Sequence, residues 1–193
     1  GIGTVGVVLF NTGRRSNSQL QADVAGFLVE LNSPGTNIIL SNGIDCYLDF
    51  ELKVYVDPSM NVNEREIVRN ELTQQIYTLI KDYEYNSLID LSLVSSYLVN
   101  NRSYNQITGY GSSTDNRNIF EKVYLRRTDR YNEFPEEREE IISNVFSLKP
   151  YERILFGSVN IEFEEDFRWR WRRWGGGGGG EEGIRESVEG KDG

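Results

Sequence analysis

The chain has 193 residues and a formal net charge of −9. Its 38% hydrophobic residues are enough to form a modest hydrophobic core, so we do not expect global disorder. The acidic charge argues against nucleic acid as a partner. No apolar run reaches the roughly 20 residues that a membrane-spanning helix needs, so we do not expect the membrane to be a partner. The sequence has no histidine, which removes the commonest general base and zinc ligand. We therefore expect a protein that is not an enzyme and that holds no cofactor or metal.

The first residues predict a strand, a helix and a second strand. Apolar residues on both faces of residues 4–10 indicate a strand inside a sheet. Ser18 is in position to cap a helix, with Gln21 completing a capping box. The apolar residues at helical spacing, which we expect to face the core, are Leu20, Val24, Phe27, Leu28 and Leu31. Ser33-Pro34-Gly35 ends this helix, and residues 37–40 predict a short strand.

Residues 46–56 show the clearest alternation in the chain, with apolar residues on one side and charged residues or tyrosines on the other. A period of two predicts a strand that is half buried and half solvated. Cys46, the one cysteine, is expected to be a small buried hydrophobe in this strand. Residues 62–83 predict the longest helix, which either Asn63 with Glu66 or Asn61 with Glu64 can cap.

The remaining elements complete the predicted fold. A shorter helix is expected at residues 88–99, and strands are expected at residues 119–126 and 154–163. Pro135 opens the run PEEREEII, for which we predict one or two helical turns. Together the elements indicate the α+β class: a mixed β-sheet with two or three helices packed on one face, in a split βαβ-like order.

The C-terminal segment differs in composition from the rest of the chain. Alternating Arg and Trp at residues 168–174 include all three tryptophans, and six glycines follow. Such a run can bind an anionic membrane surface or stack on bases, but the abrupt change favours a misread frame, a gene-end artefact or a linker. We expect an α+β module at 1–111, a Tyr/Asn-rich insert with the closing strand of the same domain at 112–166, and a disordered tail at 167–193.

Two patterns could carry chemistry. Residues 1–6 match G-x-G-x-x-G by letter, but these glycines precede or occupy a strand instead of following it, which argues against a dinucleotide site. Asp49 and Glu51 share a strand face and could serve a carboxylate-based hydrolase or bind a hard cation. A solvated strand face is the simpler interpretation of these two acids.

Large aromatic residues also occur in or near the polar connections. They are Tyr104, Tyr110, Phe120, Tyr124, Tyr131 and Phe134. Amphipathic rings of this kind anchor protein interfaces, so these residues are candidate interface positions. The alternative is that they fold back over the open face of the sheet.

Several motifs, in order, resemble the C-terminal region of the baseplate J-like proteins, the wedge components of contractile phage tails. They are GTVGVV at residues 3–8, LQADV at 20–24, SPGTNI at 33–38, the alternating strand at 48–56, the helix at 67–80, and SLIDLSLV at 87–94 leading to ITGY at 107–110. The resemblance covers about half of the chain, and the residues after Gly111 depart from it.

This resemblance implies a structural protein of the virion, assembled in the host cytoplasm. A wedge subunit of this family sits in the ring around the tail hub, contacts other wedge subunits and neighbouring copies of itself, and meets the tail sheath. It rearranges when the tail contracts, and the family brings no catalytic residues. In such proteins this region follows larger N-terminal domains. Because residue 1 is Gly and an apolar run begins almost at once, we expect the chain to be a piece of a longer protein.

Overall fold

The computed structural model describes residues 3–13, 15–31, 35–101, 104–111, 119–128 and 138–168. The helices within these ranges are α1 (Asn17–Leu31), α2 (Val62–Asp82) and α3 (Leu91–Asn100). The strands are β1 (Gly3–Leu9), β2 (Thr36–Asn42), β3 (Ile44–Val56), β4 (Leu88–Asp90), β5 (Ile107–Tyr110), β6 (Phe120–Thr128), β7 (Arg138–Glu140), β8 (Val145–Ser147) and β9 (Glu152–Glu165). The predicted tail lies outside the described residues, apart from Phe167 and Arg168.

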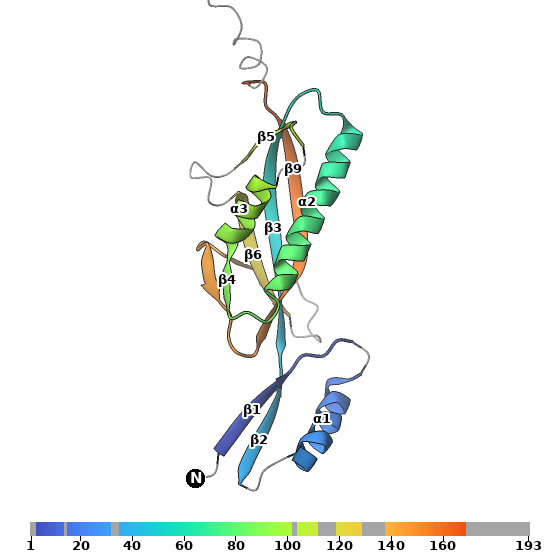
Figure 1. Cartoon of the computed structure of the whole chain (residues 1–193), viewed down its shortest axis with the longest axis vertical. Coiled ribbons are helices and arrows are strands. Elements are labelled where there is room, and N and C mark those ends of the chain that lie inside the picture. The colour runs from blue at the N-terminus through green and yellow to red at the C-terminus, as the bar shows by residue number, and fades with distance from the viewer. Residues whose placement is uncertain are drawn as a thin grey trace, which may run out of the picture.

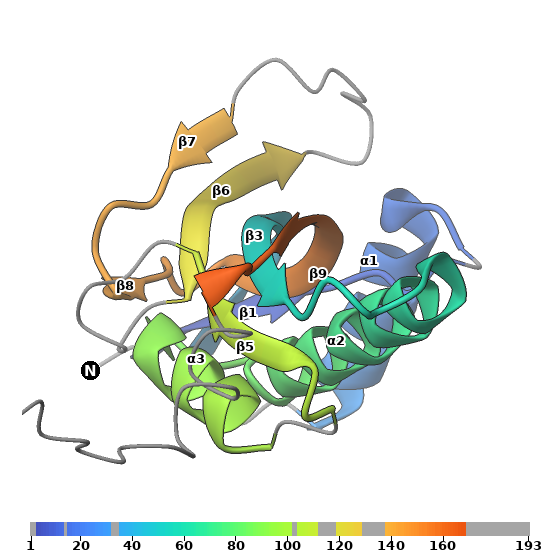
Figure 2. The same cartoon turned by 90° about the horizontal axis from the view of Figure 1, so that it is seen from above.

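The long strand β3 is the centre of the main sheet. β9 pairs with it in parallel along one side, while β6 and β5 pair antiparallel with successive parts of its other side. β7 extends the sheet beyond β6. α2 and α3 lie on the same face of this sheet (Figures 1 and 2). The predicted α+β class, with a mixed sheet and helices on one face, is therefore confirmed.

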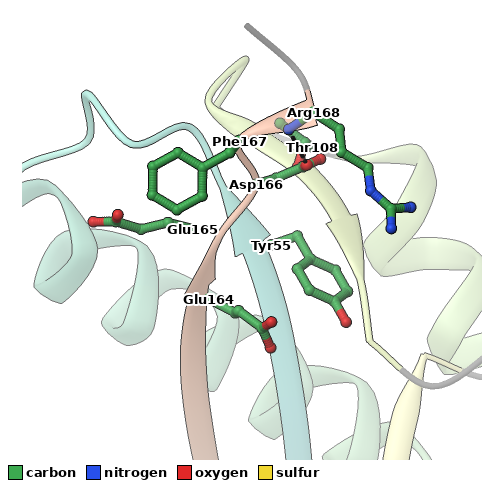
Figure 3. Close-up of a pocket in the computed structure, with 7 residues that line it drawn as sticks. All are labelled: Tyr55, Thr108, Glu164, Glu165, Asp166, Phe167 and Arg168. Atoms are coloured by element: carbon green, nitrogen blue, oxygen red, sulfur yellow. Dashed lines mark hydrogen bonds between the residues drawn. The ribbon is translucent and has the colours of Figure 1, made fainter. Parts of the chain in front are cut away.

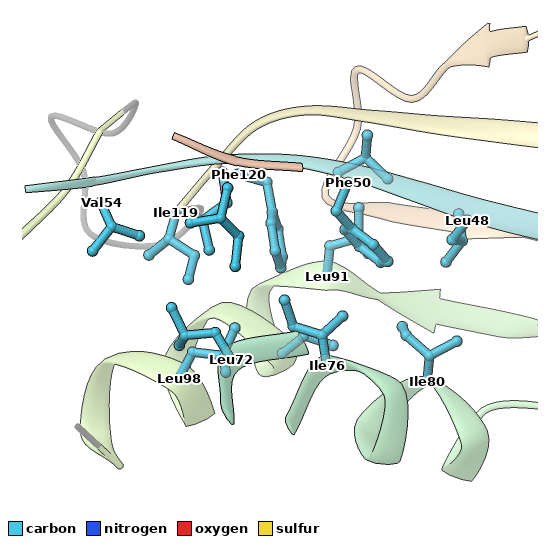
Figure 4. Packing of buried hydrophobic residues seen from close by; sticks show 14 of the residues in the cluster. Leu48, Phe50, Val54, Leu72, Ile76, Ile80, Leu91, Leu98, Ile119 and Phe120 are labelled. Carbon is cyan, nitrogen blue, oxygen red and sulfur yellow. The ribbon is translucent and has the colours of Figure 1, made fainter. Parts of the chain in front are cut away.

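The hydrophobic core lies between these two helices and the sheet (Figure 4). β3 supplies its even-numbered residues from Cys46 to Val56, which are all at most 2% exposed. The helices supply Val68, Leu72, Ile76, Ile80, Leu91, Val94 and Leu98. Side chains at every second position of a strand point to the same face of the sheet. The apolar residues of β3 therefore pack in one core with those of both helices, as the alternation predicts.

β1, α1 and β2 form a separate βαβ unit, residues 3–42. β1 and β2 pair in parallel, in register from Gly3 with Thr36 to Leu9 with Asn42, and make a two-stranded sheet of their own. The chain then passes through Gly43 into β3, so the unit projects from one end of the main sheet (Figure 1). The first two strands therefore do not join the main sheet in the described pairings. The prediction of a strand inside a sheet at residues 4–10 is wrong, because β1 pairs with β2 alone among the described strands and none of its residues is buried.

The apolar stripe predicted to face the core from α1 does not reach a core. No residue of α1 is buried, and Phe27 and Leu31 are 63% and 65% exposed. Leu20, Val24 and Leu28 are only half-buried. The reason is the width of the sheet: two strands about 4.8 Å apart are too narrow to cover an amphipathic helix.

Phe10 anchors the βαβ unit to the main sheet. Its ring packs over Gly43, where any Cβ atom would overlap the ring, and lies edge-on to Tyr85 with centroids 6.2 Å apart. The Arg153 guanidinium of β9 lies 5.1 Å from the centroid of the same ring and hydrogen-bonds Asp45 at 2.8 Å. Glycine at position 43 is thus required by the close approach of an aromatic ring.

The helix caps agree in part with the predictions. Ser16, and not Ser18, caps α1, because the Gln19 amide donates to the Ser16 hydroxyl while the Ser16 amide donates to Gln19 Oε1, both at 3.2 Å. The capping box is therefore two residues earlier than predicted. Asn61 with Glu64 caps α2, which confirms one of the two predicted alternatives.

Two short strands replace predicted helical segments. The helix expected at residues 88–99 begins only at Leu91, because β4 first pairs with β8. The helical turns predicted after Pro135 are wrong in their described part, where β7 pairs with β6. Glu139 of β7 lies 2.5 Å from the Arg127 guanidinium of β6, and such cross-strand charge pairs stabilise extended backbone.

Candidate functional site

Tyr104 and Tyr110, two of the six predicted interface aromatics, fold back over the main sheet. Both are half-buried and pack against the core. The Tyr104 hydroxyl donates to Glu71 Oε1 at 3.2 Å, and the Tyr110 hydroxyl donates to the Leu98 carbonyl at 3.5 Å. These rings join β5 and its preceding turn to α2 and α3, so both lie on the helix-covered face of the main sheet. Neither covers the open face of the sheet, which was the second interpretation offered by the sequence.

The other four aromatic candidates differ in position. Phe120 is 3% exposed and is a core residue, not a surface anchor, because it begins β6 and packs against Phe50 with ring centroids 4.8 Å apart. Tyr124 is half-buried, with the Arg138 guanidinium 5.8 Å from its ring. The final two candidates lie outside the described residues: Tyr131 and Phe134.

Asp49 lies on the face of the main sheet turned away from α2 and α3. It is 4% exposed and accepts hydrogen bonds from Arg126 Nε and the Ser158 hydroxyl, each at 2.8 Å. Burial alone would raise the pKa of Asp49, but these hydrogen bonds and the charges of Arg126 and Arg138 outweigh it and lower the pKa below 3.8. The carboxylate is therefore held ionised as a structural partner for two strands.

Glu51, the second acid of the alternative hydrolase, lies two residues further along β3, opposite Lys122 of β6. A carboxylate pair that performs acid–base catalysis needs one acid kept neutral by a raised pKa. The pKa of Asp49 is shifted in the opposite direction. This arrangement favours a structural role over the hydrolase, with charged side chains paired across strands. The predicted solvated strand face is wrong at Asp49, which is buried because Arg126 and Ser158 hydrogen-bond its carboxylate.

A pocket of about 540 Å³ lies where β3 and β9 end (Figure 3). Its lining residues are Tyr55, Thr108, Glu164, Glu165, Asp166, Phe167 and Arg168. Glu165 pairs with Arg65 at 2.9 Å, and Asp166 accepts from the Thr108 hydroxyl at 3.0 Å. Figure 3 shows Glu164 and Glu165 on opposite sides of their strand, so the acids of this pocket do not converge on one ligand.

A shallow groove of about 390 Å³ follows α2 beside α3. Its lining residues are Glu71, Gln74, Gln75, Thr78, Leu79, Asp82 and Tyr97. Glu71 already accepts the Tyr104 hydroxyl, and the side-chain oxygen of Gln75 is buried without a hydrogen-bond partner in the part of the chain that the structure describes. Within the same ranges, no group of three metal-ligating side chains occurs. The hollows of the main domain therefore give no defined chemistry.

The most distinctive surface belongs to the βαβ unit. It exposes large apolar side chains on more than one side, here together called the βαβ surface: Val5 (49% exposed), Phe27 (63%), Val29 (76%), Leu31 (65%) and Ile39 (54%). Because Val5 pairs with Ile38 and Gly6 with Ile39, Val5 and Ile39 point to opposite faces of the two strands. β1 and β2 contain no charged residue, and the charges of α1 are Asp23, which pairs with Arg15, and Glu30. Exposed apolar side chains in this number, with few charges among them, are typical of interaction sites.

Sequence reasoning missed the βαβ surface because it assigned the apolar stripe of α1 to a core. A signal was nevertheless present in the sequence. Val29 lies off the stripe, and α1 has only two charged residues to solvate its outer face. A helix with apolar residues on more than one side needs a second partner.

No family model matches this sequence, and a search of curated proteins finds no match. The resemblance to the baseplate J-like proteins therefore stays a prediction. No helix in the described ranges is both long enough and apolar enough to cross a membrane.

Proposed function

We propose that this chain is a non-catalytic structural module of a contractile phage tail baseplate, a wedge subunit that acts by contact with its neighbours. The observation that carries the proposal is the βαβ surface, whose five apolar side chains are each at least 49% exposed. Exposed apolar surface is costly in water, at about 25 cal/mol per Å², and an assembly subunit removes that cost by docking.

The kind of assembly comes from the sequence resemblance. The motifs that carry it include β1, the first turns of α1, the start of β2, the alternating strand β3 and the long helix α2. Under this proposal the partners are other wedge subunits, neighbouring copies of the chain and the tail sheath. The protein is located in the virion, and its contacts rearrange when the tail contracts.

A carboxylate-based hydrolase is the weaker candidate. Asp49 is engaged by Arg126 and Ser158, and the acids of the pocket at Glu164, Glu165 and Asp166 do not converge. Binding of membrane or nucleic acid through the Arg/Trp run depends on residues 169–174, which lie outside the described residues.

Immunogold electron microscopy tests the location directly. Contractile-tailed particles purified from the organism that encodes the chain are labelled with antibodies against it. We expect gold at the end of the tail distal to the capsid, and the chain in the particle proteome. Contractile-tailed particles that lack the chain, or gold confined to the capsid, would overturn the proposal.

A pair of matched variants tests the surface. Leu31→Glu in α1 and Leu93→Glu in α3 change leucines that are 65% and 59% exposed, so neither is expected to unfold the chain. Incorporation into particles should fail for Leu31→Glu and persist for Leu93→Glu. Equal incorporation of both variants would show that the βαβ surface is not the docking site.

A further inference from the structure

We infer that a second copy of this chain docks on the free edge of β1, with its own β1 antiparallel and the two-fold axis at Gly6. The inference rests on the proposed function, a module that works by contact, and names the partner and the register. It would join two copies of the βαβ unit into one sheet of four strands, in the order β2–β1–β1–β2.

The free edge of β1 is the first reason. Among the described pairings, β1 bonds only to β2, so one side of its seven-residue backbone is left to pair. Unpaired edges are templates for another strand, and proteins protect them with charged residues, proline or short length. β1 has none of these protections, because it has seven residues and neither charge nor proline.

The edges of the main sheet provide the contrast. β7 is three residues long and consists of Arg138, Glu139 and Glu140. β9 is long and carries its charged residues at its two ends, Glu152 and Arg153 at the start and Glu162, Glu164 and Glu165 at the end. The edge strands of the main sheet thus carry charges at least at their ends, whereas β1 carries none.

The small size of the βαβ sheet is the second reason. A two-stranded sheet is marginal in water unless further strands, or a helix packed against it, bury an apolar face. No residue of β1, α1 or β2 is buried within the described chain. Adding the β1 and β2 of a second copy supplies the missing strands.

The sequence of β1 suits pairing with itself. Gly6 is the middle of Gly3–Leu9, so an axis at Gly6 is the register that uses all seven residues. It places Thr4 opposite Val8 and Val5 opposite Val7, and cross-strand pairs of β-branched residues stabilise sheets. In this register Gly6 faces Gly6 of the second copy, so no side chains meet at the axis.

Charge also favours a second copy at this edge. The chain as a whole carries −9, which opposes self-association through most of its surface. β1 and β2 carry no charged residue, and the charges of α1 are Glu30 and the Asp23 carboxylate, which is paired with Arg15. The βαβ unit is therefore the region where two copies meet with little repulsion.

A charge-swap experiment tests both the contact and its register. Gly6→Lys and Gly6→Glu are accommodated in the single chain, because the space around Gly6 is open. Analytical ultracentrifugation of the wild type should show a dimer. Each variant alone should dimerise about fivefold or more weakly, because like charges then face each other across the axis. An equimolar mixture of the two variants should dimerise at least as tightly as the wild type.

Gly26→Lys in α1 is the matched control, because a Cβ at Gly26 also meets nothing within 4 Å. It should leave the dimer unchanged. A wild-type chain that stays monomeric, a dimer that Gly6→Lys does not weaken, or a mixture that fails to recover would each overturn the inference. A monomer that is still incorporated at the tail tip would overturn the pairing alone and leave the proposed function intact.

A cysteine variant captures a weak dimer. Gly6→Cys should form a disulfide with Gly6→Cys of the second copy in oxidised glutathione, whereas Gly26→Cys should not. The native Cys46 does not interfere, because it is buried and its pKa is raised to about 12. Equal crosslinking of the two variants would contradict the pairing.

Discussion

The βαβ unit and the main sheet carry similar helices but bury them to different extents. α1 and α2 both have apolar residues at helical spacing, yet four residues of α2 are buried and none of α1 is. α2 lies on a five-stranded sheet, whereas α1 accompanies two strands. A helical pattern therefore identifies an apolar face, and the width of the sheet beside it decides whether that face becomes core or surface.

The two regions also treat their outer faces differently. The open face of the main sheet is covered with charged side chains that pair across strands, such as Asp49 with Arg126 and Lys53 with Glu121. The βαβ surface is apolar and has no charge within its strands. The main sheet pairs its charges within the chain, whereas the βαβ unit leaves its apolar side chains exposed.

The largest expected effect compares one leucine in each region. Leu98→Ala in α3 removes a side chain that is 0% exposed, and we expect it to lower the free energy of unfolding by about 2–5 kcal/mol. Leu31→Ala in α1, 65% exposed, should change it by no more than about 0.5 kcal/mol. Urea unfolding of the monomer measures both, and equal losses would show that α1 is packed as tightly as α3.

The next comparison removes a carboxylate charge from each region. Asp49→Asn breaks a buried, hydrogen-bonded pair, so we expect a loss of about 2–3 kcal/mol at neutral pH. Asp23→Asn breaks an exposed ion pair with Arg15 and should cost less than about 1 kcal/mol. Chemical denaturation at pH 7 measures both, and equal losses would contradict a buried structural role for Asp49.

The pH dependence of this difference has a defined sign. Because the folded pKa of Asp49 lies below 3.8, its contribution is present above the unfolded value and is lost as the pH falls through the folded value. The gap between wild type and Asp49→Asn should therefore close in acid. A gap that is unchanged from pH 7 to pH 2 would show that the ionised carboxylate is not what stabilises the sheet.

The junction between the regions gives a smaller effect. Gly43→Ala places a Cβ against the Phe10 ring, and we expect a loss of about 1–2 kcal/mol. The double variant with Phe10→Ala has no such clash. Its loss of stability should therefore be about 1 kcal/mol smaller than the sum of the losses of the two single variants. Fully additive losses from urea unfolding would show that Phe10 and Gly43 do not act together.

The smallest effect concerns the buried thiol. Burial, with the nearby Glu152 charge, raises the pKa of Cys46 from 9.0 to about 12. The wild type should therefore lose stability as the pH rises above 9, where only the unfolded thiol ionises, and Cys46→Ala should lose less.

In the Cys46→Ala background, Ile39→Cys in β2 should react rapidly with a thiol reagent, whereas native Cys46 should react only on unfolding. Equal rates would contradict the burial of β3.

Local patterns predicted most of the elements but not their long-range arrangement. The strand predicted at residues 46–56 and the helix predicted at 62–83 are both confirmed, as β3 and α2. The apolar face of β3 is buried as predicted, but Asp49 on the face expected to be solvated is buried too. Arg138–Glu140 was wrongly expected to be helical, because its pairing with β6 depends on a distant strand. Phe120 was proposed as an interface residue because it lies near polar connections, but β6 carries it into the core.

The βαβ surface required knowledge that local patterns do not contain. The stripe of α1 is a valid amphipathic pattern, and only the number of strands beside it shows that Phe27 and Leu31 stay exposed. Asp49 is a comparable case. Its place on a strand face was predictable, but its bonds to Arg126 and Ser158 come from strands more than 70 residues away in sequence, at separations of 77 and 109 residues.

Hydrogen exchange, compared between the isolated chain at low concentration and purified tail particles, tests the central claim most directly. Peptides from β1 and α1 should exchange rapidly in the isolated chain and gain at least about tenfold protection in the particle, while β3 is protected in both. Unchanged exchange in β1 and α1, with new protection confined to the open face of the main sheet or to residues 164–168, would contradict a module that docks through its βαβ unit.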